Sequence, residues 1–216
     1  KCINDCSNHG LCTRDSKCVC ESGWVLDDCS ITSIELESRT TLRHELLQAV
    51  VTVFNETNSA SITMEDIKLN SVILTDITRV PAELEPKTKT MATQFFTSLV
   101  ETSATIVQQT AIDEEVIELF GNVINNLAIA SFRSDIAAQN KNLKPEYELI
   151  SSAVDTLSVA MTFNRVPNEQ EIVIVQPALS ISAVRQDVAN IAQYTVLVPS
   201  HDKNLRPSSV TIPSKF

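Results

Sequence analysis

Cysteine is missing from the sequence after position 29, although the chain has 216 residues. Glycine is also scarce, and the three glycines do not form a loop that could cradle a phosphate group or a nucleotide cofactor. The three histidines, His9, His44 and His201, stand far apart in the sequence, and acid pairs such as Asp113-Glu114 read as charges at a helix start. We therefore predict no catalytic residue and no cofactor, and we do not expect an enzyme.

Basic residues and long apolar runs are also few. Lys and Arg number 17 against 27 Asp and Glu, which gives a net charge of −10 at pH 7. Such a charge disfavours nucleic acid and anionic lipid as partners. No apolar run approaches the roughly 20 residues that a membrane-spanning helix needs, so membrane insertion is not expected. The partners that remain are other protein chains or neighbouring modules of the same chain.

All six cysteines lie between Cys2 and Cys29, with the spacing Cys-x3-Cys-x5-Cys-x5-Cys-x-Cys-x8-Cys. A segment this short cannot build a sufficient hydrophobic core, so the cysteines indicate a disulfide-stapled module made in an oxidising compartment. The sequence therefore predicts an extracellular or cell-surface protein. Because no signal peptide precedes Lys1, we expect the sequence to be a fragment of a longer protein.

Zinc binding is the other common use of clustered cysteines. Zinc sites favour Cys-x2-Cys pairs separated by a longer loop, and neither the Cys-x-Cys pair nor His9, between Cys6 and Cys12, fits that spacing. We predict no metal ligand. From the sequence alone, the pairing of the six cysteines stays open.

The spacing resembles that of an epidermal-growth-factor-like (EGF-like) module, whose closing signature is Cys-x-Cys, a short gap, glycine plus an aromatic residue, and a last cysteine. The matching residues are Cys18, Cys20, Gly23, Trp24 and Cys29. Cys-Ser-Asn-His-Gly-Leu-Cys is a common form of the middle of the module. The resemblance implies three disulfides: Cys2–Cys12, Cys6–Cys18 and Cys20–Cys29.

Two details of the module bear on binding. Its calcium-binding form is not matched, because no acidic residue precedes the first cysteine and no aromatic residue lies between the third and the fourth. Trp24 is expected to pack over the second disulfide, and a contact with a ligand is the alternative role.

Residues 31–165 are predicted to form an α-helical subdomain. Apolar residues recur at three- and four-residue steps over 31–56 and 83–109. Between them, Thr63 is an N-cap with Asp66 three residues on, and Pro81 ends that helix. Acids at 113–115 start a fourth helix and Pro145 opens a fifth as its first residue, so five helices in a bundle-like layer are expected.

The first of these helices is predicted to bury one apolar face. The residues of this face are Ile34, Leu42, Leu46, Leu47, Val50, Val53 and Phe54. At the end of the helix, Asn55-Glu56-Thr57 is an N-glycosylation acceptor. We expect an N-glycan on Asn55 in an exported protein, and an unused chance sequon is the alternative.

Residues 166–216 are predicted to form a β-strand subdomain. Short stretches rich in Val and Ile occur at 171–175, 178–184, 194–198 and 210–212. Four short strands leave a sheet with too little cover, so we expect strands from a continuation of the chain or from a neighbouring chain to complete it. With an EGF-like module at residues 1–30, the predicted fold class is α+β, with several domains.

The order of these parts resembles the beginning of a GAIN-type domain, which occurs in the extracellular regions of adhesion receptors and polycystin-like proteins. Two patches carry the resemblance: Gln-Pro-Ala-Leu-Ser-Ile-Ser-Ala-Val at 176–184 and Ser-Val-Thr-Ile-Pro-Ser-Lys-Phe at 209–216. It implies a helical subdomain followed by a twisted β-sandwich. The self-cleavage motif of the family is framed by cysteines and Trp, which are absent after Cys29, and His201 precedes Asp202, so self-cleavage is not implied.

These observations predict an extracellular, non-enzymatic adhesion, recognition or spacer segment of a large cell-surface receptor-like glycoprotein. The alternative is a structural subunit of an extracellular filament, coat or matrix assembled from such modules. The two hypotheses differ downstream, since a receptor requires a membrane span in the full-length product and a filament subunit does not.

Overall fold

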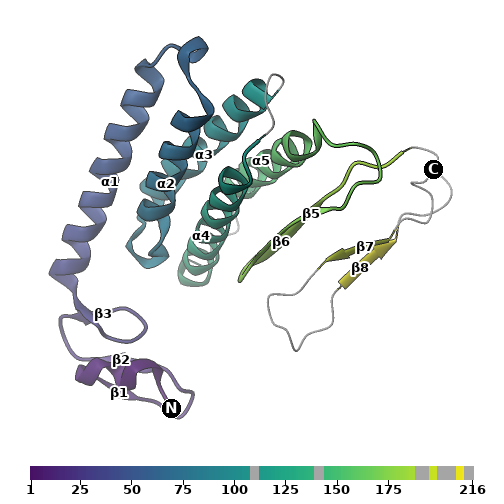
Figure 1. Cartoon of the computed structure of the whole chain (residues 1–216). Coiled ribbons are helices and arrows are strands. Elements are labelled where there is room, and N and C mark those ends of the chain that lie inside the picture. Colours follow the sequence, from purple (N-terminus) through teal and green to yellow (C-terminus); the bar gives the residue numbers. More distant parts are fainter. Residues whose placement is uncertain (108–111, 139–143, 188–194, 199–207, 212–216) are drawn as a thin grey trace.

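The computed structural model describes residues 1–107, 112–138, 144–187, 195–198 and 208–211, with the backbone alone at 132–138, 144–147, 195–198 and 208–211. A small N-terminal head leads into five helices, and two β-hairpins follow (Figure 1). The mixture of helices and small antiparallel sheets confirms the broad α+β class. None of the helices within these ranges is long and apolar enough to cross a membrane.

The head contains one short helical segment and four short strands. These are η1 (Ile3–Asn8), β1 (Gly10–Cys12), β2 (Cys18–Cys20), β3 (Trp24–Val25) and β4 (Ile31–Thr32). β1 pairs with β2 and β3 pairs with β4, both antiparallel. The core of the head consists of buried cysteine side chains, which take the place of the aliphatic side chains in the core of a larger domain.

Five helices form the body of the structure. They are α1 (Ser33–Glu56), α2 (Met64–Thr78), α3 (Pro86–Val107), α4 (Glu114–Ala138) and α5 (Lys144–Thr162), with the turns η2 (Ser59–Ser61) and η3 (Pro81–Glu83) between them. The largest fully buried side chains of their common core are Phe96 and Phe120, whose rings meet edge to face at 5.5 Å between centroids.

The predicted helix starts agree with the structure. The Thr63 hydroxyl accepts a hydrogen bond from the Asp66 amide, and the Asp66 carboxylate accepts one from the Thr63 amide, which completes a capping box. α2 ends before Pro81, as expected from the missing amide hydrogen of proline. Pro145 is the second residue of α5, one position later than predicted, still within the turn whose amides need no helical partner.

The predicted buried face of the first helix is wrong at four of its seven residues. Leu47 and Phe54 are buried and Val50 packs against the core, but Ile34 is 79% exposed and Val53 is 65% exposed. The other exposed members of the predicted face are Leu42 and Leu46. α1 lies at the outer edge of the helical layer (Figure 1). Its buried residues, Thr40, Leu47 and Phe54, are seven positions apart and form a narrow strip, so only part of the predicted apolar face is covered.

The four predicted strands are present, with bounds shifted by one or two residues. β5 (Ile172–Gln176) and β6 (Leu179–Ala183) form a hairpin in which Ile174 lies opposite Ile181. β7 (Thr195–Val198) and β8 (Ser208–Thr211) form a second antiparallel hairpin, with β7 beside β6. The hairpins are separate two-stranded sheets within the described ranges.

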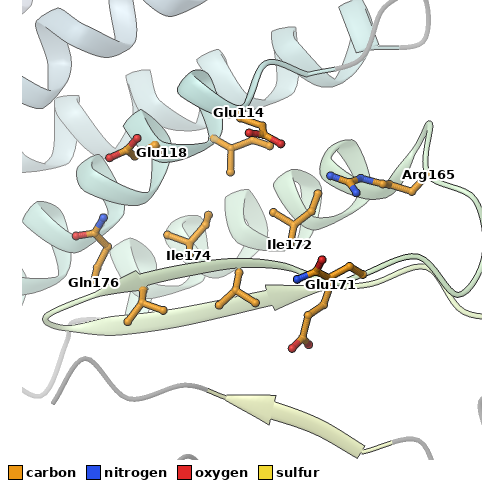
Figure 2. A pocket seen from close by; sticks show the side chains of 11 residues that line it. Glu114, Glu118, Arg165, Glu171, Ile172, Ile174 and Gln176 are labelled. Carbon is orange, nitrogen blue, oxygen red and sulfur yellow. The ribbon is translucent and has the colours of Figure 1, made fainter. Parts of the chain in front are cut away.

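The first hairpin packs directly on the helices. Ile174 and Ile181 belong to the same hydrophobic cluster as the helical core. Figure 2 shows Ile172 and Ile174 directed from β5 toward α4. The strand can approach because α4 carries Gly121 at this point, where an added Cβ atom would lie 2.5 Å from Ile174 Cγ2. The division into parts at 1–30, 31–165 and 166–216 stays a prediction.

Candidate functional site

The head is closed by three disulfides. They join Cys2 to Cys12, Cys6 to Cys18 and Cys20 to Cys29, which is the pairing that the EGF-like resemblance implied. In the described ranges, the closest approach to a metal-ligand cluster is the group of Cys2, Cys6 and Cys18, whose sulfur atoms lie within 4.8 Å of one another. Each of these sulfurs is in a disulfide and offers no thiolate, so the group is unsuited to bind zinc.

Trp24 packs against the cystine cluster of the head and stacks on His9. The ring centroids lie 3.4 Å apart and the ring planes differ by 5°. Both side chains are half-buried, so part of the stacked pair faces solvent. The stacking of His9 was not predicted, because nothing in the cysteine spacing shows that the residue before β1 lies against the first residue of β3.

The head joins α1 without a linker. Ile31 and Thr32 form β4, which pairs back to β3, and the Thr32 hydroxyl then caps α1 by accepting a hydrogen bond from the Glu35 amide at 3.1 Å. The Ser33 amide donates to the Gly23 carbonyl at 2.9 Å. Ile31 is buried at this junction. The orientation of the head relative to α1 is therefore fixed by backbone pairing and by the helix cap.

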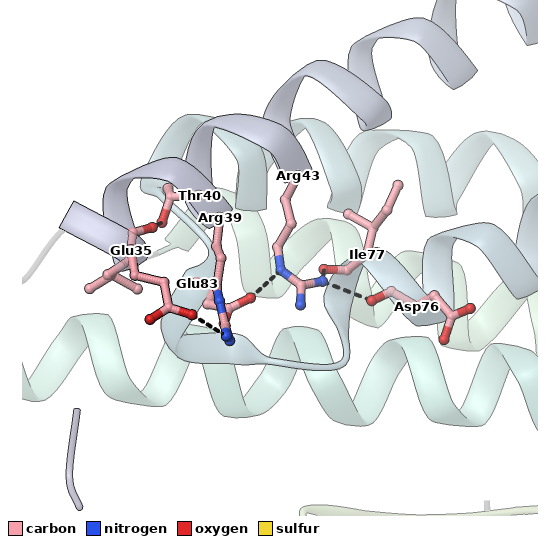
Figure 3. Close-up of polar contacts among 8 residues, drawn as sticks. Glu35, Arg39, Thr40, Arg43, Asp76, Ile77 and Glu83 are labelled. Carbon is pink, nitrogen blue, oxygen red and sulfur yellow. Dashed lines mark hydrogen bonds and ion pairs between the residues drawn. The ribbon is translucent and has the colours of Figure 1, made fainter. Parts of the chain in front are cut away.

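A buried carboxylate in η3 pairs with two arginines of α1, one of which also bonds to the end of α2 (Figure 3). Glu83, in η3, accepts hydrogen bonds from Arg43 Nε at 2.6 Å and from Arg39 Nη1 at 3.1 Å. Arg43 Nη1 also donates to the Asp76 and Ile77 carbonyls near the C-terminus of α2, at 2.8 and 2.7 Å. Helix carbonyls at this end lack intrahelical partners, and a guanidinium supplies one.

We call Glu35, Arg39, Arg43 and Glu83 the Glu83 cluster, since Glu35 pairs with Arg39 at its exposed side. Burial by itself raises the pKa of the Glu83 carboxyl. The hydrogen bonds and positive charges of Arg43 and Arg39 outweigh burial, so the pKa of Glu83 lies below its usual value. The Glu83 carboxylate therefore stays ionised. Its ion pairs with Arg39 and Arg43 attach α1, a helix that makes few apolar contacts, to η3.

A groove lies between β5 and the first two turns of α4. Its volume is about 570 Å³, and Figure 2 shows the surrounding side chains. Glu114, Ile117 and Glu118 line it from α4, while the run 170–176, which is β5 and the two residues before it, lines the opposite side. Arg165 closes one side. At the other end of β5, the Gln176 side-chain amide donates to Asn122 Oδ1 at 3.0 Å.

The structure places two of the three histidines in side-chain contacts within the described residues. His9 stacks on Trp24, and His44 Nδ1 lies 3.0 Å from the hydroxyl of the buried Thr88, so His44 is tied to α3. His201 lies outside the described residues. The Asp113 carboxylate accepts a hydrogen bond from the Glu115 amide at the start of α4, which is the helix-start role predicted for it.

The predicted glycosylation site is accessible. Asn55 is exposed in the last turn of α1. Thr57 follows as the C-cap residue, and its hydroxyl donates to the Val53 carbonyl at 2.8 Å. Nothing in the surrounding structure covers the Asn55 side chain, and the N-glycan stays a prediction.

No family model, curated protein or solved structure matches the chain. The EGF-like and GAIN-type resemblances therefore stay predictions based on the residues quoted for them.

Proposed function

We propose that the chain is an extracellular, non-enzymatic recognition or spacer segment of a large cell-surface glycoprotein, with an EGF-like head and a GAIN-type body. The observation that carries this proposal is the direct junction of the disulfide-closed head with α1. Disulfides are made in oxidising compartments, and three of them in a short head favour an exported protein.

The junction favours a role in which geometry matters. α1 has 24 residues, which corresponds to a length of about 36 Å. The head sits at its first residue, and the Glu83 cluster ties the helix to α2. A load or a ligand on the head therefore acts on the helical body through one continuous element. This is the behaviour expected of a spacer or of a recognition module with a fixed orientation.

The first test is disulfide and glycan mapping of the natively purified parent protein, without reduction. We expect the three disulfides of the structure and a mass shift at Asn55 on removal of N-glycans. Free thiols in the head would contradict export. The same map identifies the parent, because a membrane span beyond residue 216 supports a receptor, and further extracellular modules without a span support the filament or matrix alternative.

The second test addresses recognition by the head. The parent protein is displayed on beads, and binding to cells is compared for wild type, His9→Ala and Val19→Ala. Val19 is exposed in β2 of the same head and is not a member of the aromatic stack, so it serves as the matched control. If the head recognises a partner through the stack, His9→Ala lowers binding and Val19→Ala does not. Binding that survives deletion of the whole head would contradict a recognition role for the head.

The alternative, a structural subunit of an extracellular filament or coat, is favoured by the open edges of the two hairpins. It predicts that the purified parent forms polymers as its concentration rises. Sedimentation velocity over a range of concentrations distinguishes the two proposals, since a receptor segment sediments as one species.

A further inference from the structure

One edge of the β5–β6 hairpin is open. β5 pairs with β6 from Ile172 opposite Ala183 to Gln176 opposite Leu179, and no described strand pairs with its other edge. In an antiparallel pair, every second residue directs its N–H and C=O groups away from the partner strand. A strand of five residues therefore offers hydrogen-bonding groups along an edge of about 17 Å.

The groove described above follows this open edge. Consecutive residues from Gln170 to Gln176 line it, and consecutive strand residues alternate between the two faces. A hollow that touches both faces of a strand runs beside the strand, where a neighbouring strand would lie. Its volume of about 570 Å³ lies in the range of ordinary ligand sites.

The helix wall of the groove is acidic. Glu114 and Glu118 are both exposed, and neither forms an ion pair with another residue of the described ranges. They are four residues apart on α4, so they stand about 6 Å apart along the helix axis. Side chains at alternate positions of an extended chain stand about 6.8 Å apart on one face. The two spacings match.

We propose that the open edge of β5 binds an extended segment of another protein by strand addition. The segment carries Lys or Arg at two alternate positions, which face Glu114 and Glu118. Backbone hydrogen bonds to β5 hold the segment, and the two basic side chains select it. This site lies on the hairpin and α4, so it is independent of the role proposed for the head.

A second copy of this chain does not have the required chemistry at this edge. The β5 sequence, Ile-Val-Ile-Val-Gln, contains no basic residue, and Glu171 precedes it. Pairing of two β5 edges would bring Glu114 and Glu118 of both copies together, in a chain with a net charge of −10. Charge complementarity therefore favours a basic segment of a different protein.

The probe is the peptide acetyl-Thr-Val-Lys-Val-Lys-Val-Thr-amide, titrated into the whole chain and followed by fluorescence anisotropy and amide hydrogen exchange. We expect binding together with slower exchange at residues 172–176. A peptide with Glu in place of both Lys, and one with Pro in place of the central Val, should bind at least about tenfold more weakly, because they lose the charge match or a backbone donor.

The matched variants are Glu114→Lys/Glu118→Lys and Glu37→Lys/Glu45→Lys. Each pair changes the net charge equally, and Glu37 and Glu45 are exposed on α1, away from the groove. The first pair should lower the affinity for the Lys peptide by about tenfold, since exposed ion pairs contribute up to about fivefold each, whereas the second pair should leave it nearly unchanged. Circular dichroism checks that both variants keep their helices.

Three results would overturn the inference. The first is equal binding of the Lys and Glu peptides, and the second is unchanged binding by Glu114→Lys/Glu118→Lys. The third is protection of residues 172–176 in a dimer without peptide, which would make a second copy the occupant of the groove.

Discussion

Replacing Glu83 with Gln tests whether charge holds α1 on the body. The Glu83 side chain is 3% exposed, and Arg43 beside it is 19% exposed. Gln keeps the shape and removes the negative charge, so the guanidinium of Arg43 loses its ionic partner. Removal of one member of a buried ion pair costs about 3–5 kcal/mol.

The expected loss is smaller than this range. Arg39 is half-exposed, and Arg43 keeps its hydrogen bonds to the Asp76 and Ile77 carbonyls. We therefore expect Glu83→Gln to lower the free energy of unfolding by about 2 kcal/mol. The matched control is Glu35→Gln, because Glu35 and Arg39 are both close to half-exposed and such pairs contribute about 0.5 kcal/mol or less.

Urea unfolding followed by far-ultraviolet circular dichroism measures this difference. Trp24 is the single tryptophan and lies in the head, so its fluorescence follows the head separately from the helices. We expect the helical transition of Glu83→Gln to move to lower urea concentration. If Glu83→Gln and Glu35→Gln unfold at the same urea concentration, the Glu83 cluster does not stabilise the packing of α1, and the argument from burial is wrong.

Three further predictions follow from single contacts. The pKa of Glu83 is lower in the folded than in the unfolded chain. The contribution of the Glu83 carboxylate to folding stability is therefore complete above the unfolded pKa and is lost as the pH falls through the folded pKa. On acid titration, the free energy of unfolding of Glu83→Gln should fall less steeply than that of the wild type. Gly121→Ala should lower the free energy of unfolding by about 1–3 kcal/mol despite the better helix propensity of Ala, because its Cβ would meet Ile174. Ile174→Ala should cost less stability in the Gly121→Ala background than in the wild type, and a stabilised Gly121→Ala variant would contradict the contact. Thr63→Ala removes the N-cap of α2 and should cost about 1 kcal/mol in urea unfolding. Thr52→Ala, at an exposed position near the C-terminal end of α1, should have little effect.

The sequence located most elements because their signals are local. A capping box such as that of Thr63 and Asp66 stabilises a helix start through bonds within one turn, so it can be recognised without the rest of the fold. The run of Ile and Val in β5 and the alternation of apolar residues with Ser in β6 are equally local. The buried face of α1 could not be located in this way, because periodicity shows that an apolar face exists and does not show how much surface is available to cover it.

The candidate sites were less predictable than the elements. From the sequence, His9 was considered as a metal ligand, and Glu83 had no predicted role. The fold brings Trp24 to His9 and the two arginines of α1 to Glu83, and neither contact has a local signal in the sequence. The role of Gly121 has no local signal in the sequence, because its close approach to Ile174 depends on how β5 crosses α4. The groove between β5 and α4 likewise exists through the packing of segments far apart in the sequence.

The sequence by itself therefore determined the cysteine-rich head, the helix starts and stops, and the strands, since each depends on residues a few positions apart. The tertiary structure decided which apolar faces are buried, which carboxylates are paired and which strand edge is open. The physical reason is that burial, ion pairing and strand pairing join residues distant in sequence. Glu83 is buried where η3 meets α1 and α4, whereas Glu114 and Glu118 remain exposed and line the groove beside β5.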